Sequence, residues 1–239
     1  MYIIGGLGPA RSNEGFTFDY DLPNETAYAE TCAAIALVFF AQRMFQLEPN
    51  ARYIDVMERA LYNGFLSGVS YDGTHFFYAN PLAAYPKVDP HDPWTAVRSD
   101  PHYRRQEWFL CPCCPPNLAR LIASIGSYFY SVAGDTIYVN LYDSNRSDID
   151  IDGRTVRLEQ QTNYPWDETI RLTVTVQQPT YFTLALRIPG WCRDARLQVN
   201  GQDVPLNSEH GYAHISREWT SGDSVTLTLA MPVERMLAH

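Results

Sequence analysis

Four of the five cysteines lie in the first half of the sequence, as an isolated Cys32 and the segment Cys111-Pro-Cys113-Cys114. Adjacent cysteines are poor disulfide partners, because the bond needs Cα atoms about 4.4–6.8 Å apart and neighbouring residues are held at about 3.8 Å. A metal ion tolerates adjacency, since two Sγ atoms can turn onto one ion. Zn²⁺ accepts cysteines together with an occasional carboxylate in four-coordinate geometry. These residues favour a zinc site made by Cys32, Cys113, Cys114 and a fourth ligand.

Glu30 is the candidate for the fourth ligand. Residues two apart on a helix point about 200° from each other, so Glu30 and Cys32 converge only if a helix begins between them. A start near Thr31 also places Cys32 at a helix N-terminus, where a thiolate is stabilised. Two alternatives stay open, namely inert buried thiols and a disulfide from Cys32 to Cys113 or Cys114. Cys192 is predicted to be a buried thiol.

Carboxylates and histidines are a second source of chemistry. Glu14, Asp19 and Asp21 lie among aromatic residues, a composition found in sugar-binding sites and also on ordinary protein surfaces. The composition does not choose among these three acids. Glu58 is predicted either to lie on a solvated helix face or to contact a site residue without taking part in the chemistry itself. The histidines at 75, 91 and 102 are expected either in the pocket or exposed.

The elements that must position these residues differ between the two halves. In the first half we predict a buried helix at 31–47, an amphipathic helix at 52–66 ending at Gly68, and a hairpin at 69–78 around Asp72-Gly73. An irregular loop follows at 79–112, and a third helix begins after Cys114 and ends at Gly134. Beyond Gly134 the apolar period changes to 2, which predicts an antiparallel β-sandwich. The predicted strands are 136–142, 149–151, 156–159, 169–176, 181–188, 197–199, 212–216 and 224–230.

The composition excludes several classes of protein. With 239 residues and 46% hydrophobic content the chain can bury a core, and its net charge of −9 argues against nucleic acid as a partner. The longest apolar run, residues 33–41, is about half of the roughly 18 residues that a membrane span needs. An odd number of cysteines leaves at least one thiol free.

Several motifs together resemble glycoside hydrolase family 127, the β-L-arabinofuranosidases. They occur in the same order as in that family, and the likeness continues more loosely into the second half. The motifs are Gly5-Gly-Leu-Gly, Glu14-Gly-Phe, Tyr20-Asp-Leu-Pro-Asn-Glu-Thr-Ala-Tyr, Glu30-Thr-Cys-Ala, Tyr62-Asn-Gly-Phe-Leu-Ser-Gly, Phe77-Tyr-Ala-Asn-Pro-Leu, Cys113-Cys114-Pro-Pro-Asn-Leu-Ala-Arg, Leu186-Arg-Ile-Pro-Gly-Trp-Cys and Val199-Asn-Gly. The resemblance implies an (α/α)6 barrel followed by a β-sandwich, and a retaining hydrolase with a zinc-bound cysteine nucleophile.

The resemblance also assigns roles to residues. It implies zinc ligands at Glu30, Cys32, Cys113 and Cys114, with Cys113 as the nucleophile. The acid/base carboxylate falls on Glu14 and a substrate-contacting tyrosine on Tyr78, and Glu58 becomes a candidate for the floor of the pocket. Residues 1–130 would be the end of the helical barrel and 131–239 the β-sandwich. The sugar-binding histidines of the family lie upstream of the motif at Met1, so we expect a fragment that is inactive or aggregation-prone by itself.

The expected partner is an oligosaccharide or glycoconjugate containing L-arabinofuranosides, with no nucleic acid or membrane partner and a homodimer left open. Reduced thiols on zinc favour the cytoplasm. The alternative function is a non-catalytic, zinc-stabilised module whose β-sandwich binds carbohydrate or a protein partner.

Overall fold

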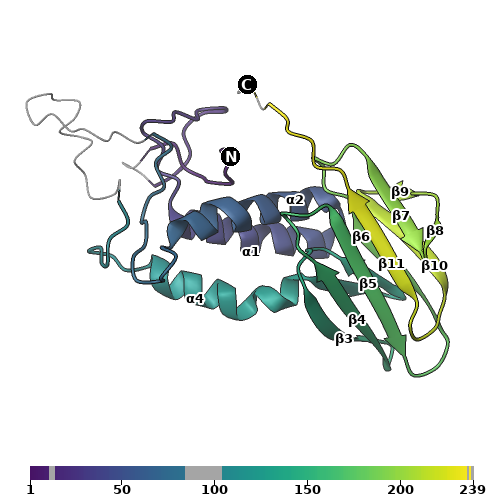
Figure 1. Ribbon diagram of the computed structural model, residues 1–239. Coiled ribbons are helices and arrows are strands. Elements are labelled where there is room, and N and C mark those ends of the chain that lie inside the picture. Colours follow the sequence, from purple (N-terminus) through teal and green to yellow (C-terminus); the bar gives the residue numbers. More distant parts are fainter. Residues whose placement is uncertain (11–13, 84–103, 236, 238–239) are drawn as a thin grey trace, which may run out of the picture. The chain divides into compact units, whose positions relative to one another are not determined.

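The computed structural model describes residues 1–10, 14–83, 104–235 and 237. The chain forms two compact units, of which the first comprises Met1–Gln46 with Val56–Ile125 and the second Leu47–Asp55 with Gly126–Ala238. Helices dominate the first unit and strands the second (Figure 1). The change of period near residue 130 therefore corresponds to a change of architecture.

Helix α1 (Thr31–Leu47) follows the prediction, because its sequence is rich in alanine and large apolar residues and contains neither glycine nor proline. Its buried face includes Ala34, Ile35, Val38, Ala41 and Phe45 at helical spacing. The second predicted helix is helical throughout but changes type. It begins as α2 (Ala51–Arg59) and continues as the π-helix η1 (Ala60–Phe65) and the 3₁₀-helix η2 (Leu66–Gly68).

Two predictions in the first unit are corrected. The segment 69–78 forms a turn with an isolated bridge between Val69 and Phe76 rather than a hairpin of two strands. Phe76 instead forms a further bridge with Gln106, far along the chain. The third helix, α4 (Cys114–Ser124), continues only through the 3₁₀-helix η4 (Ile125–Tyr128) and ends before Gly134. Gly134 has a positive φ of 57° and turns the chain between a strand at Tyr130–Ala133, where the helix was predicted to continue, and the predicted strand that begins at Thr136.

The second unit contains two sheets, as expected for a sandwich (Figure 1). One sheet has the strand order β1-β2-β6-β10-β9 and the other β3-β4-β5-β11-β7-β8. The strands are β1 (Tyr130–Ala133), β2 (Thr136–Val139), β3 (Asn145–Ile151), β4 (Arg154–Thr162), β5 (Thr169–Val176), β6 (Thr180–Arg187), β7 (Ala195–Val199), β8 (Gln202–Asp203), β9 (Ser208–Glu209), β10 (Tyr212–Trp219) and β11 (Ser224–Leu229). The expectation of a purely antiparallel arrangement is wrong, because β2 and β6 pair in parallel. Three strands of the other sheet separate them in sequence, and so long a connection can return the chain in the same direction.

The core of the sandwich comes from the alternation that the sequence shows. Along β5 the buried residues are Ile170, Leu172, Val174 and Val176, with more exposed residues between them. The turns at Asp152-Gly153 and Asn200-Gly201 have positive φ at both residues, the conformation that tight hairpins require. Together these features make one continuous hydrophobic core between the sheets.

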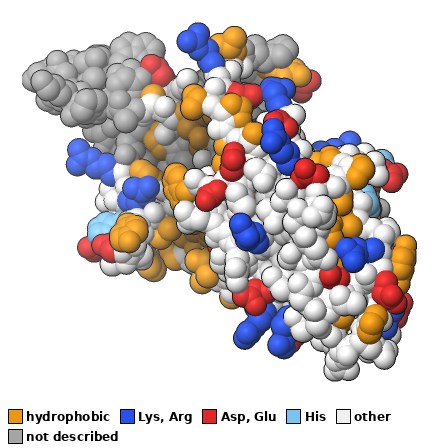
Figure 2. Space-filling model, turned by 45° about the vertical axis from the view of Figure 1, so that its right-hand side comes forward, with side chains coloured by type: hydrophobic (Ala, Val, Ile, Leu, Met, Phe, Trp, Pro, Cys, Tyr) orange, Lys and Arg blue, Asp and Glu red, His pale blue; other side chains and the backbone are white. Residues whose placement is uncertain are grey.

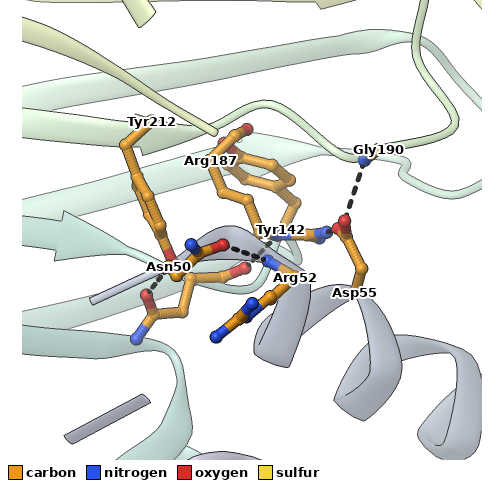
Figure 3. Close-up of polar contacts among 8 residues, drawn as sticks. Asn50, Arg52, Asp55, Tyr142, Arg187, Gly190 and Tyr212 are labelled. Carbon is orange, nitrogen blue, oxygen red and sulfur yellow. Dashed lines mark hydrogen bonds and ion pairs between the residues drawn. The ribbon is translucent and has the colours of Figure 1, made fainter. Parts of the chain in front are cut away.

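A buried charge lies beside that core. Arg187 at the end of β6 is fully buried, and its Nη1 lies 2.7 Å from the Asp55 carboxylate (Figure 3). Its Nε donates a hydrogen bond to the Asn140 carbonyl at 2.7 Å, and its guanidinium carbon lies 5.7 Å from the centre of the Tyr142 ring. The Tyr212 hydroxyl donates to the Asn140 side chain at 2.7 Å. The guanidinium is therefore paired inside this unit.

Large apolar side chains also lie at the surface, and some hydrophobic side chains are visible on the face shown in Figure 2. In the first unit they include Phe40, Leu66, Trp108, Leu110 and Ile122. The expected tendency of the isolated chain to aggregate stays a prediction that these residues motivate. Within the described part of the chain, no helix has the length and apolarity that crossing a bilayer would require.

Candidate metal and catalytic site

Four residues that are far apart in the sequence meet in the first unit. The Sγ atom of Cys32 lies 3.4 Å from that of Cys113 and 3.7 Å from that of Cys114. The two adjacent cysteines have their Sγ atoms 3.8 Å apart, and Cys113 Sγ lies 3.5 Å from Glu30 Oε1. All four ligand atoms lie within 4.8 Å of one another. These are the four residues to which the family resemblance assigns the role of zinc ligands.

The spacing fits a tetrahedral zinc ion. With Zn–S bonds of about 2.3 Å and Zn–O bonds of about 2.0–2.2 Å, the edges of a tetrahedron are about 3.8 Å between sulfurs and about 3.5 Å between sulfur and oxygen. Four of the six distances among the ligand atoms run from 3.4 to 3.8 Å, and all six are within 4.8 Å. All five cysteines are free thiols, and thiolates with one carboxylate form a donor set that suits zinc.

Two helix N-termini bring the cysteines together. Helix α1 begins at Thr31, so Glu30 precedes the helix and Cys32 lies in its first turn. Helix α4 begins at Cys114, with Cys113 as its N-cap residue. The prolines at 115 and 116 suit the first turn, where a backbone N–H has no helical partner. Because the N-terminal end of a helix carries partial positive charge, both helices favour thiolates here.

The segment before α1 is held from another part of the unit. Asn80, 5% exposed, donates from Nδ2 to the Ala29 carbonyl at 2.9 Å and to the Thr31 hydroxyl at 3.1 Å. Ala29 has a positive φ of 40°, a conformation that alanine rarely adopts and that its neighbours must hold in place. The Thr31 amide donates to the Tyr78 carbonyl at 2.9 Å. These hydrogen bonds fix the backbone around Glu30 and thus the direction in which its side chain points.

Aromatic rings surround the cluster. Phe76 and Phe109 are buried with Cys114, their ring centres 5.0 Å apart, and Tyr78 packs edge-on against Phe109 at 5.8 Å. The Tyr78 hydroxyl also hydrogen-bonds to Cys113. The surroundings thus lower the local dielectric constant and strengthen every charge interaction in the cluster.

Burial and mutual contact shift the pKa values of the ligands in opposite directions. The hydrogen bond from Cys114 lowers the pKa of Cys32 to about 6, whereas burial raises that of Cys113 to about 12. The hydrogen bond with Cys32, together with burial, raises the pKa of Cys114 above its usual range. Burial and then the charge on Cys32 raise the pKa of Glu30 to about 7. The four groups resist ionising together, and a divalent cation relieves that repulsion.

Glu14 lies beside the cluster on an exposed loop with a positive φ of 49°. Its Oε1 accepts a hydrogen bond from the Tyr28 hydroxyl at 2.9 Å. Glu14, Tyr28 and Glu30 line one cavity of about 160 Å³. The structure therefore places the proposed acid/base residue and one proposed metal ligand in the wall of the same cavity.

The remaining candidates lie outside the cluster. Asp19 is on the exposed part of the Glu14 loop, and the half-buried Asp21 accepts a hydrogen bond from Thr17. Glu58 is 5% exposed and lies on the buried side of α2. Of the two positions predicted for it, the solvated helix face is therefore wrong. His75 is at a turn with Nε2 3.8 Å from Glu107, and the histidines at 91 and 102 lie outside the described residues. Cys111 is exposed, and Cys192 is half-buried in the second unit, where it donates to the Asp194 carbonyl.

Sequence reasoning missed Tyr28 and Asn117. Asn117 lies one helical turn after Cys113 and Cys114 on α4, and its side chain hydrogen-bonds to Cys32. Arg120 donates to the Asn117 oxygen, which leaves the amide NH₂ group free to face Cys32. The i+3 and i+4 spacing from the cysteines is the signal that could have revealed Asn117.

The chain matches the GH127 β-L-arabinofuranosidase catalytic domain over residues 1–127 and the GH127 middle domain over residues 136–231. It therefore belongs to the GH127 β-L-arabinofuranosidase family.

Several known proteins resemble it closely. A non-reducing end β-L-arabinofuranosidase of Bifidobacterium longum subsp. longum is 38% identical over 97% of the chain. The crystal structure of Ara127N-Se, a GH127 β-L-arabinofuranosidase from Geobacillus stearothermophilus T6, superimposes on all of it with a TM-score of 0.93 and 53% identity. A further GH127 β-arabinofuranosidase structure covers 97% of the chain with a TM-score of 0.87 and 41% identity. The chain spans 35% of the Bifidobacterium protein and 37% of each of these two structures.

Proposed function

We propose that the chain contributes the nucleophile, the acid/base residue and the metal ligands of a retaining hydrolase of β-linked L-arabinofuranosides. Its substrates are oligosaccharides or glycoconjugates that contain this sugar. The helices of residues 1–130 belong, in this proposal, to an (α/α)6 barrel, and residues 131–239 form the β-sandwich. The observation that carries the proposal is the convergence of three thiols and one carboxylate within 4.8 Å.

Zn²⁺ bound by Glu30, Cys32, Cys113 and Cys114 would supply a positive charge that keeps the thiols ionised at neutral pH. Cys113 is the best placed nucleophile, because it is partly accessible whereas its neighbour Cys114 is 0% exposed. The Tyr78 hydroxyl donates to Cys113 and orients its sulfur. Cys32 is also partly accessible, but the Asn117 amide contacts it.

The reaction would use two displacements at the anomeric carbon. In the first, a bond forms from Cys113 Sγ to that carbon while the glycosidic C–O bond breaks, and Glu14 gives its proton to the departing oxygen. In the second, Glu14 takes a proton from water, the water oxygen bonds to the anomeric carbon, and the C–S bond breaks. Cys113 returns as a thiolate and Glu14 as an acid.

The test uses a chimera in which residues 1–239 replace the matching part of the Geobacillus enzyme, because the chain spans 37% of that protein. We call this the chimeric enzyme. Cys113→Ala should lower kcat for 4-nitrophenyl β-L-arabinofuranoside at least about 10⁴-fold, as expected for loss of a nucleophile. Glu14→Gln should lower turnover of a phenyl arabinoside about 10²- to 10⁴-fold through loss of proton transfer.

Cys192→Ala is the matched control, because it removes a thiol from the second unit and should leave turnover unchanged. Product analysis by NMR should show the β-anomer first, since two displacements retain the configuration. Turnover by Cys113→Ala near the unsubstituted level would overturn the proposal. If that substitution changed only stability, the chain would be a metal-stabilised module without a catalytic cysteine.

A further inference from the structure

A buried tyrosine holds the exposed Glu14 carboxylate. Glu14 lies on a loop whose following residues, from Phe16 to Tyr20, are also exposed. An exposed glutamate on a loop samples several rotamers, yet an acid/base residue must stay within hydrogen-bond reach of one oxygen. The Tyr28 hydroxyl, 2.9 Å from Glu14 Oε1, restricts this side chain.

The fold itself fixes Tyr28. Its side chain is 4% exposed, and its backbone is anchored on both sides. The Tyr28 amide donates to the Gly8 carbonyl at 3.1 Å, and the Asn80 amide donates to the Tyr28 carbonyl at 3.0 Å. The position of its hydroxyl is therefore set by the packed part of the unit rather than by the Glu14 loop.

Tyr28 also connects Glu14 with the sulfur of Cys113. The rings of Tyr28 and Tyr78 lie 6.2 Å apart. Tyr78 in turn hydrogen-bonds to Cys113. Tyr28 thus contacts Glu14 while the neighbouring Tyr78 contacts Cys113, so two packed rings connect the two reacting side chains.

We propose that Tyr28 is a positioning residue that orients Glu14 for proton transfer to the leaving group. This inference rests on the proposed function, because it takes Glu14 as the acid. Oε1 accepts the Tyr28 hydrogen bond, so the acid carries its proton on Oε2 and presents that oxygen to the glycosidic oxygen. Without the hydroxyl, the Glu14 carboxyl group remains but loses the contact that fixes its direction.

The experiment compares Tyr28→Phe with Tyr2→Phe in the zinc-loaded chimeric enzyme. Tyr2 is a matched control, because it is 3% exposed and its hydroxyl donates at 3.0 Å to the Pro23 carbonyl, away from Glu14. Each variant is assayed with phenyl and with 4-nitrophenyl β-L-arabinofuranoside. Phenol is a poor leaving group that needs an acid, whereas 4-nitrophenolate departs without one.

Tyr28→Phe should lower kcat/KM for the phenyl substrate about 10-fold more than for the nitrophenyl substrate, part of the usual contribution of acid catalysis. Tyr2→Phe should change both substrates equally. The ratio between substrates is independent of the folded fraction, because both are measured on one preparation. In a Glu14→Gln background, Tyr28→Phe should leave the ratio unchanged, since the group it orients is gone.

An equal loss for both substrates in Tyr28→Phe would overturn the inference, whatever the size of that loss. So would a further change of the ratio in the Glu14→Gln background. These results are distinct from failure of the proposed function, which appears as full turnover by Cys113→Ala. Zinc content, measured on each variant, should equal that of the unsubstituted chimera, and selective loss of zinc in Tyr28→Phe would also contradict a positioning role.

Discussion

The two units differ in how the charges of their buried polar groups are balanced. In the sandwich unit, Arg187 is fully enclosed, and Asp55 supplies the opposite charge at 2.7 Å. In the helical unit, Cys113, Cys114 and Glu30 lie against Cys32, and all four can carry the same sign of charge. The first arrangement is complete with the residues of this chain, whereas the second, in our proposal, takes a cation.

The difference separates a charge with a structural role from a cluster for which we propose a functional one. The Asp55 carboxylate accepts hydrogen bonds from the Arg187 guanidinium and, at 3.0 Å, from the Gly190 amide (Figure 3). It therefore fixes the end of β6 and the turn that follows. Such a pair is costly to break and performs no chemistry. The thiol cluster keeps its groups within reach of one another against their repulsion, which is the condition of a ligand set.

The largest expected effect tests the structural side of this comparison. Asp55→Ala leaves the Arg187 guanidinium buried without its counter-charge and should lower the free energy of unfolding by about 3–5 kcal/mol. Urea unfolding of the chimeric enzyme, followed by tryptophan fluorescence, measures the change. Asp148→Ala is the matched control, because it breaks a pair with Arg157 at 2.6 Å in which both partners are about half exposed. Equal effects of the two substitutions would contradict the assigned role of Arg187.

The next effect tests the functional side through pH. Without the ion, Cys113 and Cys114 keep their protons above pH 7, because burial and contact raise their pKa values. Zinc binding must release both protons, so its apparent Kd should fall about 100-fold per unit as pH rises from 7 to 8. Below pH 7 the dependence steepens as Glu30 and then Cys32, with pKa values of about 7 and 6, also take up protons. Competition with a chromogenic chelator measures the Kd, and a pH-independent value would rule out these thiols as ligands.

The smallest effect concerns a residue that contacts a ligand without being one. Asn117→Ala removes the amide that hydrogen-bonds to Cys32 and should weaken zinc binding about 10-fold, at the lower end for groups that orient metal ligands. Asn117→Asp is the sharper variant, because a carboxylate cannot donate to the sulfur and adds like charge. Cys192→Ser serves as the control and should leave the affinity unchanged. Stronger binding by Asn117→Asp than by Asn117→Ala would contradict the hydrogen bond.

Most elements were predictable from local patterns, and the exceptions share one cause. The buried face of α1 and the alternation of β5 follow from side-chain periodicity, which local sequence contains. The segment 69–78 has a hairpin sequence but pairs in part with Gln106, and β2 pairs in parallel with β6. Both departures depend on partners distant in sequence, which no local period reveals.

By itself, the sequence determined which types of residue are available as ligands and catalytic groups. The adjacency of Cys113 and Cys114 disfavoured a disulfide between them, and the Glu30-Thr-Cys32 spacing required a helix to begin at the site. Only the tertiary structure decided that residues 81 or more positions apart meet at 3.4–3.7 Å, and that Tyr28 rather than a neighbour in sequence holds Glu14. The physical reason is that covalent geometry fixes what adjacent residues can do, whereas the tertiary structure, which brings the N-terminal ends of α1 and α4 together, fixes which distant side chains converge.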